Sequence, residues 1–208
     1  MAAPVVHIVL ADLAHRRFFP DLSRREFLIG TSFPDIRYLV GLPRAVTHFP
    51  DVLVRGLFGE GAFMAGAKFH SVVDNEREKY MIAHGAYAHV PASRYASQSL
   101  KFFEDEVLYG RFDGWQGVID DFATIPYEAS PFPVEKKGMD LWYASLRRYF
   151  AVPPTAETQK AFIVSTDLTE AAADEIRRVI DGMRDKEELR QIILSCYDGF
   201  EALLAAGA

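Results

Sequence analysis

Residues 61–83 constrain the fold more than any other segment, because they form the longest helical pattern and carry polar residues in its apolar stripe. Steps of three and four residues place Phe63, Ala67, His70 and Asp74 on one face. His70 and Asp74 are four residues apart, so their side chains meet above one turn. Burial of both without partners costs several kcal/mol. A metal cation satisfies both groups at once, and a plain His–Asp hydrogen bond in the core is the alternative.

The rest of the chain also favours helices over strands. Helical patterns or capping residues cover further segments, at 5–17, 23–30, 44–57 (broken by Pro50), 95–109, 139–150, 169–183 and 186–205. We expect Gly30 to end the second of these segments, and Ser32 to cap a following helix with Pro34 in its first turn. The only short β-branched run is at 162–164. We therefore predict an all-α chain.

The length of 208 residues suggests one domain, and we find no internal repeat or low-complexity tract that divides it. We expect residues 1–208 to form a single helical domain, in which residues 1–110 make the metal-site half. Residues 111–138, which are rich in Gly and Pro, are expected to form a loop-rich connection. Residues 139–208 are expected to form scaffold helices.

Charge and cysteine content argue against several classes of function. The net charge of −6 speaks against a broad basic surface for duplex nucleic acid. The single cysteine, Cys196, excludes an intramolecular disulfide and a Cys-rich zinc site. No apolar run reaches the roughly 18 residues of a transmembrane helix, and the first residues make a poor signal peptide. We expect a cytoplasmic protein without a transmembrane segment.

Histidines cluster in the N-terminal part of the chain, where all six lie within the first 89 residues. His7, Asp35 and His48 lie in apolar surroundings, as His70 and Asp74 do. Taken singly, Asp35 reads as a first-turn helix acid, and each histidine reads as a satisfied core residue. Their joint occurrence favours a shared divalent metal ion, with zinc as the first choice.

The order of these residues resembles a known family. The series His7, Phe-Pro-Asp35-Ile, Thr-His48-Phe and Phe-His70-Ser-Val-Val-Asp74 is similar to the zinc-dependent phospholipase C family, whose superfamily includes the fungal single-strand-specific nucleases. The resemblance covers roughly residues 5–80 and implies the all-α helical fold of that superfamily. It also implies that Asp35, His48, His70 and Asp74 ligate one zinc, and that His7 ligates a neighbouring zinc.

The chain departs from that family in its other ligands. Trinuclear members use the amino group and carbonyl of a processed N-terminal residue, a site that we do not expect here. They also use a further His and a His-x3-Glu pair, and this sequence contains no His-x3-Glu. His84, His89 and Glu106 are candidate substitutes; they read otherwise as a helix-end histidine, a loop histidine and part of a solvated acidic face at 104–106. One metal, two metals and a degenerate site therefore all stay open.

These observations predict a metal-dependent hydrolase that acts on a small phosphoester, with a metal-activated water as the nucleophile. Arg37 and Lys68 are candidate substrate contacts. The chain has no Gly-x-Ser-x-Gly and no phosphate-cradling Gly-rich loop. Serine hydrolase and P-loop chemistry therefore lack their signatures.

Three other hypotheses stay open. A non-catalytic helical protein could use the same residues as a structural or degenerate metal site, or as a polar core network. An HD-like phosphohydrolase is a rival all-α metal enzyme, although its adjacent His-Asp pair is absent from the sequence. The apolar face of residues 186–205 could bind a partner or form a homodimer, or it could pack in the core.

Overall fold

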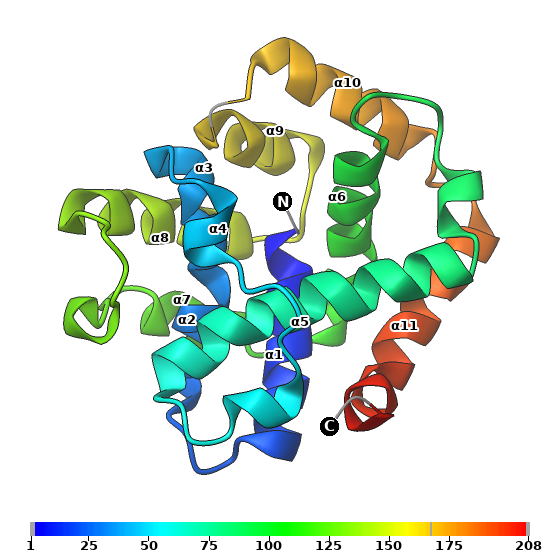
Figure 1. Cartoon of the computed structure of the whole chain (residues 1–208). Helices are drawn as coiled ribbons and strands as arrows, with labels where there is room; N and C mark the ends of the chain where they lie inside the picture. The colour runs from blue at the N-terminus through cyan, green and yellow to red at the C-terminus, as the bar shows by residue number, and fades with distance from the viewer. Residues whose placement is uncertain (1–2, 167, 207–208) are drawn as a thin grey trace.

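The computed structural model describes residues 3–166 and 168–206, and this part of the chain is all-α, as predicted (Figure 1). None of the described residues forms a strand. Short 3-10 turns connect several of the helices. The helices are α1 (Pro4–Phe18), α2 (Arg24–Ser32), α3 (Arg37–Val40), α4 (Arg44–Thr47), α5 (Ala62–Ala83), α6 (Ala96–Leu108), α7 (Trp115–Asp121), α8 (Lys136–Phe150), α9 (Ala156–Ser165), α10 (Glu170–Asp181) and α11 (Glu187–Ala206).

Helix α1 lies at the centre of the fold, where it contacts α2, α5, α6 and α11. Figure 1 shows α1 and α5 crossing near the middle of the molecule, with α9 and α10 at one end. The sequence of α1 is apolar almost all round, which suits a helix surrounded by others. One continuous hydrophobic core includes residues from α1, α2, α5, α6, α8, α10 and α11. Among the described residues, no helix combines the length and the apolar composition needed to cross a bilayer.

Two glycines let α2 and α5 cross in direct backbone contact. A Cβ on Gly30 would lie 2.1 Å from the carbonyl oxygen of Phe63, and a Cβ on Gly66 would lie 2.1 Å from that of Phe27. Any other residue at either position would therefore force the two helices apart. The close crossing places the C-terminal half of α2 against the N-terminal part of α5, from Phe63 to His70.

The prediction that Gly30 ends the helix was wrong, because α2 continues to Ser32. Gly30 serves the helix crossing instead of a left-handed cap. Ser32 is not an N-cap: its hydroxyl donates to the carbonyl of Leu28, inside its own helix. Pro34 begins a 3-10 turn, Pro34–Ile36, that leads into α3.

Side chains from α8 and α5 satisfy the last carbonyls of α2, which have no partner within the helix. The Tyr143 hydroxyl donates to Ile29 O over 2.8 Å, and the Trp142 indole donates to Ser32 O over 2.9 Å. His70 Nδ1 lies 2.9 Å from Thr31 O. The C-terminal part of the chain, which we expected to be scaffold, thus fixes the segment that carries Asp35.

Other local predictions differ from the structure in two places. Helix α9 covers the β-branched run at 162–164, because Thr155 and Thr158 form a capping box that starts a helix there. Helix α7 lies within the segment 111–138, which we expected to be loop-rich. The predicted 44–57 helix is broken at Pro50, as expected, into α4 and a 3-10 turn, Val54–Leu57. The apolar face of α11 packs into the protein's own core, where Leu189, Ile193 and Leu204 are buried.

Replacement of Gly30 by Ala should destabilise the protein, because the new methyl group must push α2 away from α5. Overpacking of this kind costs about 1–3 kcal/mol. Urea unfolding followed by circular dichroism measures the loss. The matched control is Gly199→Ala in α11, where a Cβ meets nothing within 4 Å; we expect this change to be neutral or to stabilise by up to about 1 kcal/mol. Equal stability of the two variants would contradict the close crossing.

Candidate metal centre

Five side chains from four segments meet where α1, α2 and α5 come together. They are His7 on α1, Asp35 in the 3-10 turn after α2, His48 directly after α4, and His70 and Asp74 on α5. His7, Asp35, His48 and His70 are buried, and the Asp74 side chain is 10% exposed. Segments far apart in the sequence therefore converge on one small polar volume inside an apolar core.

Four of these side chains enclose a common point. His48 Nε2 and His70 Nε2 lie 3.8 and 3.9 Å from Asp35 Oδ1, and each lies 3.8 Å from Asp74 Oδ2. Donor atoms around one tetrahedral zinc, with bonds of about 2.0–2.2 Å, lie about 3.3–3.6 Å apart. The four His–Asp distances exceed that spacing by a few tenths of an ångström, and the donor atoms of Asp35, His48 and His70 all lie within 4.8 Å of one another. The two nitrogen and two oxygen donors also suit zinc chemically.

The facing atoms lack the hydrogen bonds that burial demands. Within the described residues, His48 Nε2, His70 Nε2 and Asp35 Oδ1 are buried and have no hydrogen-bond partner. Each buried polar atom left unpaired costs about 1–3 kcal/mol. Three such atoms facing one another are best explained by a cation between them, because a cation accepts lone pairs from all three at once.

His7 and the second oxygen of Asp74 form an adjoining group. His7 Nε2 lies 3.6 Å from Asp74 Oδ1, whereas the oxygen that faces His48 and His70 is Oδ2. The His7 ring stacks on His70 with 3.8 Å between the ring centres. Neither ring nitrogen of His7 has a hydrogen-bond partner among the described residues. Asp74 could therefore bridge two ions, one of them beside His7.

Neighbouring groups hold the imidazoles so that Nε2 faces the cluster. His70 Nδ1 donates to the carbonyl of Thr31, which leaves the lone pair on Nε2. His48 Nδ1 lies 2.9 Å from the hydroxyl of Thr47. The backbone N–H of Phe49 donates to Ser71 Oγ over 3.0 Å, which ties the segment after α4 to α5 beside His70. We did not predict the roles of Thr31 and Ser71 from the sequence.

Burial keeps the two central imidazoles neutral. Desolvation, assisted by a neighbouring imidazole in each case, lowers the pKa of His48 to about 3 and that of His70 to about 4. Burial alone would raise the pKa of Asp35 and Asp74. The nearby imidazoles lower it, and the lowering outweighs the effect of burial, so the pKa of both carboxyls lies below its usual value. Neutral imidazoles and ionised carboxylates are the forms that ligate a metal.

A small cavity lies on the inner side of the cluster. His7, Asp35 and His70 line it together with Trp142, Leu146, Phe162, Pro4 and Ser32, and its volume is about 10 Å³. A volume of this size holds about one water molecule. The wall on this side is largely apolar, and Asp74, the most exposed of the five side chains, marks the outer side of the cluster.

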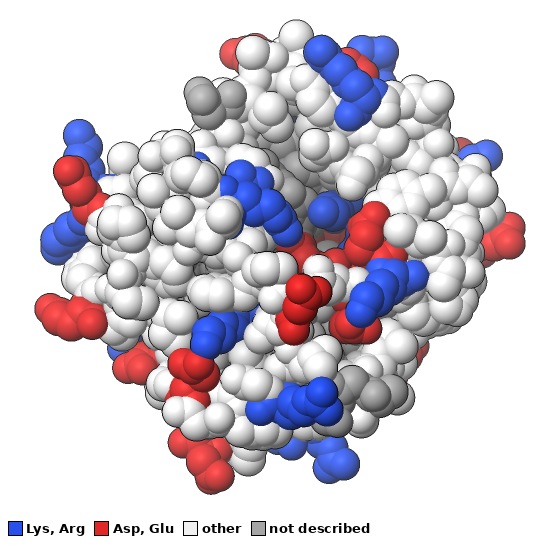
Figure 2. Space-filling model, in the orientation of Figure 1, with Lys and Arg blue, Asp and Glu red and all other residues white. Residues whose placement is uncertain are grey.

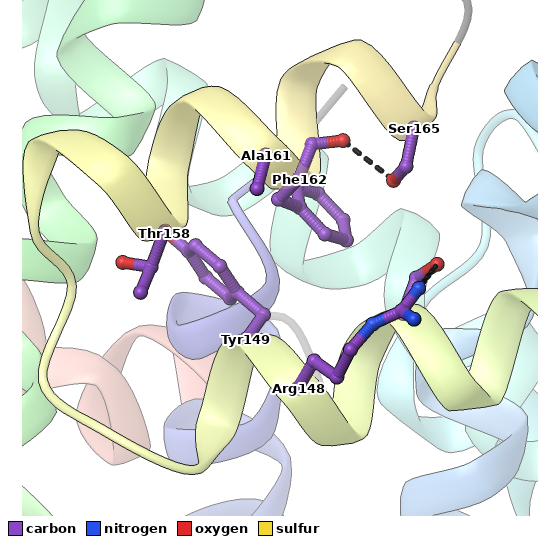
Figure 3. Close-up of a pocket in the computed structure, with 7 residues that line it drawn as sticks. Arg148, Tyr149, Thr158, Ala161, Phe162 and Ser165 are labelled. Carbon is purple, nitrogen blue, oxygen red and sulfur yellow. Dashed lines mark hydrogen bonds between the residues drawn. The ribbon is translucent and has the colours of Figure 1, made fainter.

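A larger groove of about 160 Å³ lies between α8 and α9 (Figure 3). Arg148, Tyr149, Thr158 and Phe162 contribute to its lining, together with Ser145, Ala161 and Ser165. Its lining contains no imidazole and no carboxylate, so it offers no metal ligand and no ready general base. Phe162 also lines the small cavity beside the cluster.

The additional candidate ligands lie elsewhere. His84 follows the last turn of α5, about 20 Å along the helix from His70; it is exposed and stacks on Tyr80. Glu106 binds Arg184 through two nitrogens, and His89 Nε2 lies 3.8 Å from Glu188 Oε2. The structure does not bring these three residues to the five-residue cluster. Lys68, a candidate substrate contact, pairs with Glu60.

Asp105 on α6 fixes the start of α1 and thereby the position of His7. Its carboxyl accepts 3.0 Å hydrogen bonds from the Val6 N–H and the Tyr149 hydroxyl. The expectation of a solvated face at 104–106 was wrong for two of its residues, because Glu104 and Asp105 are buried. Burial raises the pKa of Asp105 well above its usual value, although both hydrogen bonds lower it.

Comparisons with models of protein families, with curated proteins and with solved structures find no significant match for this chain. The resemblance to the zinc-dependent phospholipase C family therefore stays a prediction that depends on the five residues of the cluster. Binding of a metal by these residues stays a prediction as well.

We expect Asp105→Asn to change how stability depends on pH. A carboxyl whose pKa is higher in the folded state binds more protons when the protein is folded. Its contribution to the free energy of unfolding is therefore complete below pH 3.8 and is lost as the pH rises through the folded pKa. Between pH 3.8 and the folded pKa, this contribution to the free energy of unfolding falls by up to about 1.4 kcal/mol per pH unit. Urea unfolding at pH steps from acidic to neutral should show this decline for the natural protein relative to Asp105→Asn. The exposed control Asp113→Asn should follow the natural protein, and a parallel profile for Asp105→Asn would contradict the assignment.

Zinc should raise the melting temperature of metal-free protein, because an ion that binds only the folded state stabilises it by about 2.7 kcal/mol at 100 times its Kd. Asp35→Asn and His70→Gln each remove one ligand and should abolish this rise. Calorimetry with zinc and with a chelator measures the shift, and circular dichroism checks that each variant is folded. The control His84→Gln should keep the full shift. A shift that persists in Asp35→Asn and His70→Gln would show that zinc binds elsewhere.

Proposed function

We propose that this protein is a divalent-metal-dependent hydrolase of phosphoesters. One observation carries the proposal: buried carboxylate and imidazole atoms of Asp35, His48 and His70 face one another without hydrogen-bond partners. An ion held there would supply Lewis-acid chemistry, in which it lowers the pKa of a water molecule and neutralises charge on the phosphoryl oxygens. The order of the residues, which resembles the zinc-dependent phospholipase C family, supports the same reaction class.

The protein's own residues have separable tasks in this proposal. Asp35, His48, His70 and Asp74 would hold the first ion, and His7 with the other oxygen of Asp74 would hold a second. The contact of His70 Nδ1 with Thr31 O keeps the lone pair of His70 on Nε2, and the Thr47 hydroxyl holds the ring of His48 through Nδ1. The closed apolar wall on the inner side excludes bulk water, so charge interactions at the cluster are strong.

A structural metal site is the second candidate, and one observation favours it. Four of the five side chains are at most 6% exposed, and the adjoining cavity holds about one water. Structural zinc sites are closed, whereas catalytic sites keep a position open for water or substrate. The two candidates differ in what they require beside Asp74, the most exposed of the five side chains. A catalytic site needs a coordination position there that is open to water or substrate, and a structural site does not.

Hydrolysis assays on protein reloaded with zinc, manganese or magnesium test the proposal. We expect turnover of nitrophenyl phosphate esters, and His70→Ala should reduce it more than the roughly 10–100-fold typical of changes outside the ligand shell. The control His89→Ala alters a histidine that pairs with Glu188 on α11 and should keep full activity. Stoichiometric metal binding without turnover for any ion would favour the structural site instead.

A further inference from the structure

Basic side chains border the one exposed edge of the cluster. Arg44 on α4 contacts Asp74 Oδ2 through one guanidinium nitrogen at 3.1 Å, and its side chain is 52% exposed. A guanidinium carries five N–H donors, so this contact leaves most of them free. Arg44 thus stands beside the carboxylate on the outer side of the cluster.

Arg37 and Tyr38 on α3 lie next to this edge. The Arg37 guanidinium stacks over the Tyr38 ring, 3.8 Å from its centre, and donates to the Tyr38 hydroxyl. Burial and the negative charges of Asp35 and Asp74 raise the pKa of Tyr38 to about 12, against the lowering effect of Arg37 and Arg44. The Tyr38 hydroxyl therefore stays protonated at neutral pH and can donate a hydrogen bond to an anion. Arg37 Nε is buried and has no partner among the described residues.

Figure 2 shows basic and acidic side chains gathered around a hollow near the centre of one face. In the same view of Figure 1, this place lies over α5, between α3 and α4 on one side and α6 on the other.

The balance of charge at this edge favours a doubly charged ligand. The cations Arg37 and Arg44 balance the carboxylates Asp35 and Asp74 before any metal ion binds. A divalent ion then leaves an excess of two positive charges. A terminal phosphate group carries close to two negative charges at neutral pH, whereas a phosphodiester carries one. Guanidinium groups also match the geometry of phosphate oxygens.

We propose that Arg44 and Arg37 form a binding site for a terminal phosphate group, so that the substrates of this protein are phosphomonoesters. This inference rests on the proposed function and names the substrate class of the same site. Arg44 is the central residue, because it alone contacts both the cluster and the solvent-facing edge directly. The Tyr38 hydroxyl supplies a neutral donor to the same phosphate.

Calorimetric titration with inorganic phosphate and with dimethyl phosphate tests the inference on zinc-loaded protein. We expect the protein to bind the dianion at least about tenfold more tightly than the monoanionic diester, and Arg44→Gln to remove that preference. Arg16→Gln is a matched control: Arg16 is also exposed and also contacts a buried carboxylate, Asp12, through one nitrogen at 3.0 Å.

The same titrations separate failure of this inference from failure of the proposed function. Zinc stoichiometry, measured by elemental analysis, should stay unchanged in Arg44→Gln, because Asp74 keeps its ligating oxygen. If zinc binds to the natural protein but Arg44→Gln and Arg16→Gln bind phosphate equally well, the phosphate site is wrong and the metal site stands. If the natural protein takes up no zinc, both proposals fail. A preference for dimethyl phosphate over inorganic phosphate would overturn the assignment to monoesters.

Discussion

The direct backbone contact between α2 and α5 is the constraint on which the candidate site depends. Gly30 and Gly66 each lie against a carbonyl of the opposite helix, so the two axes cannot approach in this way with any larger residue. The crossing leaves the last carbonyls of α2 inside the core, where each needs a donor. His70 supplies one of these donors, and by doing so it turns its Nε2 toward Asp35, four residues beyond Thr31. One packing contact thereby places two of the ligand atoms.

The sequence predicts the members of the cluster better than it predicts the local structure around them. His70 and Asp74 stand out because polar groups on an apolar stripe need a partner, and that reasoning requires no knowledge of the fold. Gly30 misled the local prediction because a glycine near a helix end serves equally as a left-handed cap or as a place of close approach. Only the position of Phe63 on another helix decides between these roles.

Arg44 and Asp105 escaped prediction for a related reason. Each acts across a long stretch of sequence: Asp105 bonds the backbone of Val6, and Arg44 contacts Asp74 from another helix. Helical periodicity reports which face of a helix is apolar, but it does not report which helices are neighbours. A signal for Arg44 was present nonetheless, since it precedes His48 by four residues and so faces the same side of a helical turn.

The electrostatics of the cluster differ between its inner and outer parts. At the outer edge, Arg44 provides a positive charge to Asp74, and water can reach the pair, so this contact contributes modestly to stability. At the inner part, Asp35 Oδ1 faces only neutral imidazoles and has no donor among the described residues. Replacement of these groups by apolar ones would remove the unfavourable burial, so stability alone does not explain their presence. A cation between them would account for the inner atoms, and in our proposal the basic edge binds the phosphate on which such a cation would act. Both parts share Asp74, whose two oxygens face different partners, so this carboxylate would link the proposed metal site to the proposed phosphate site.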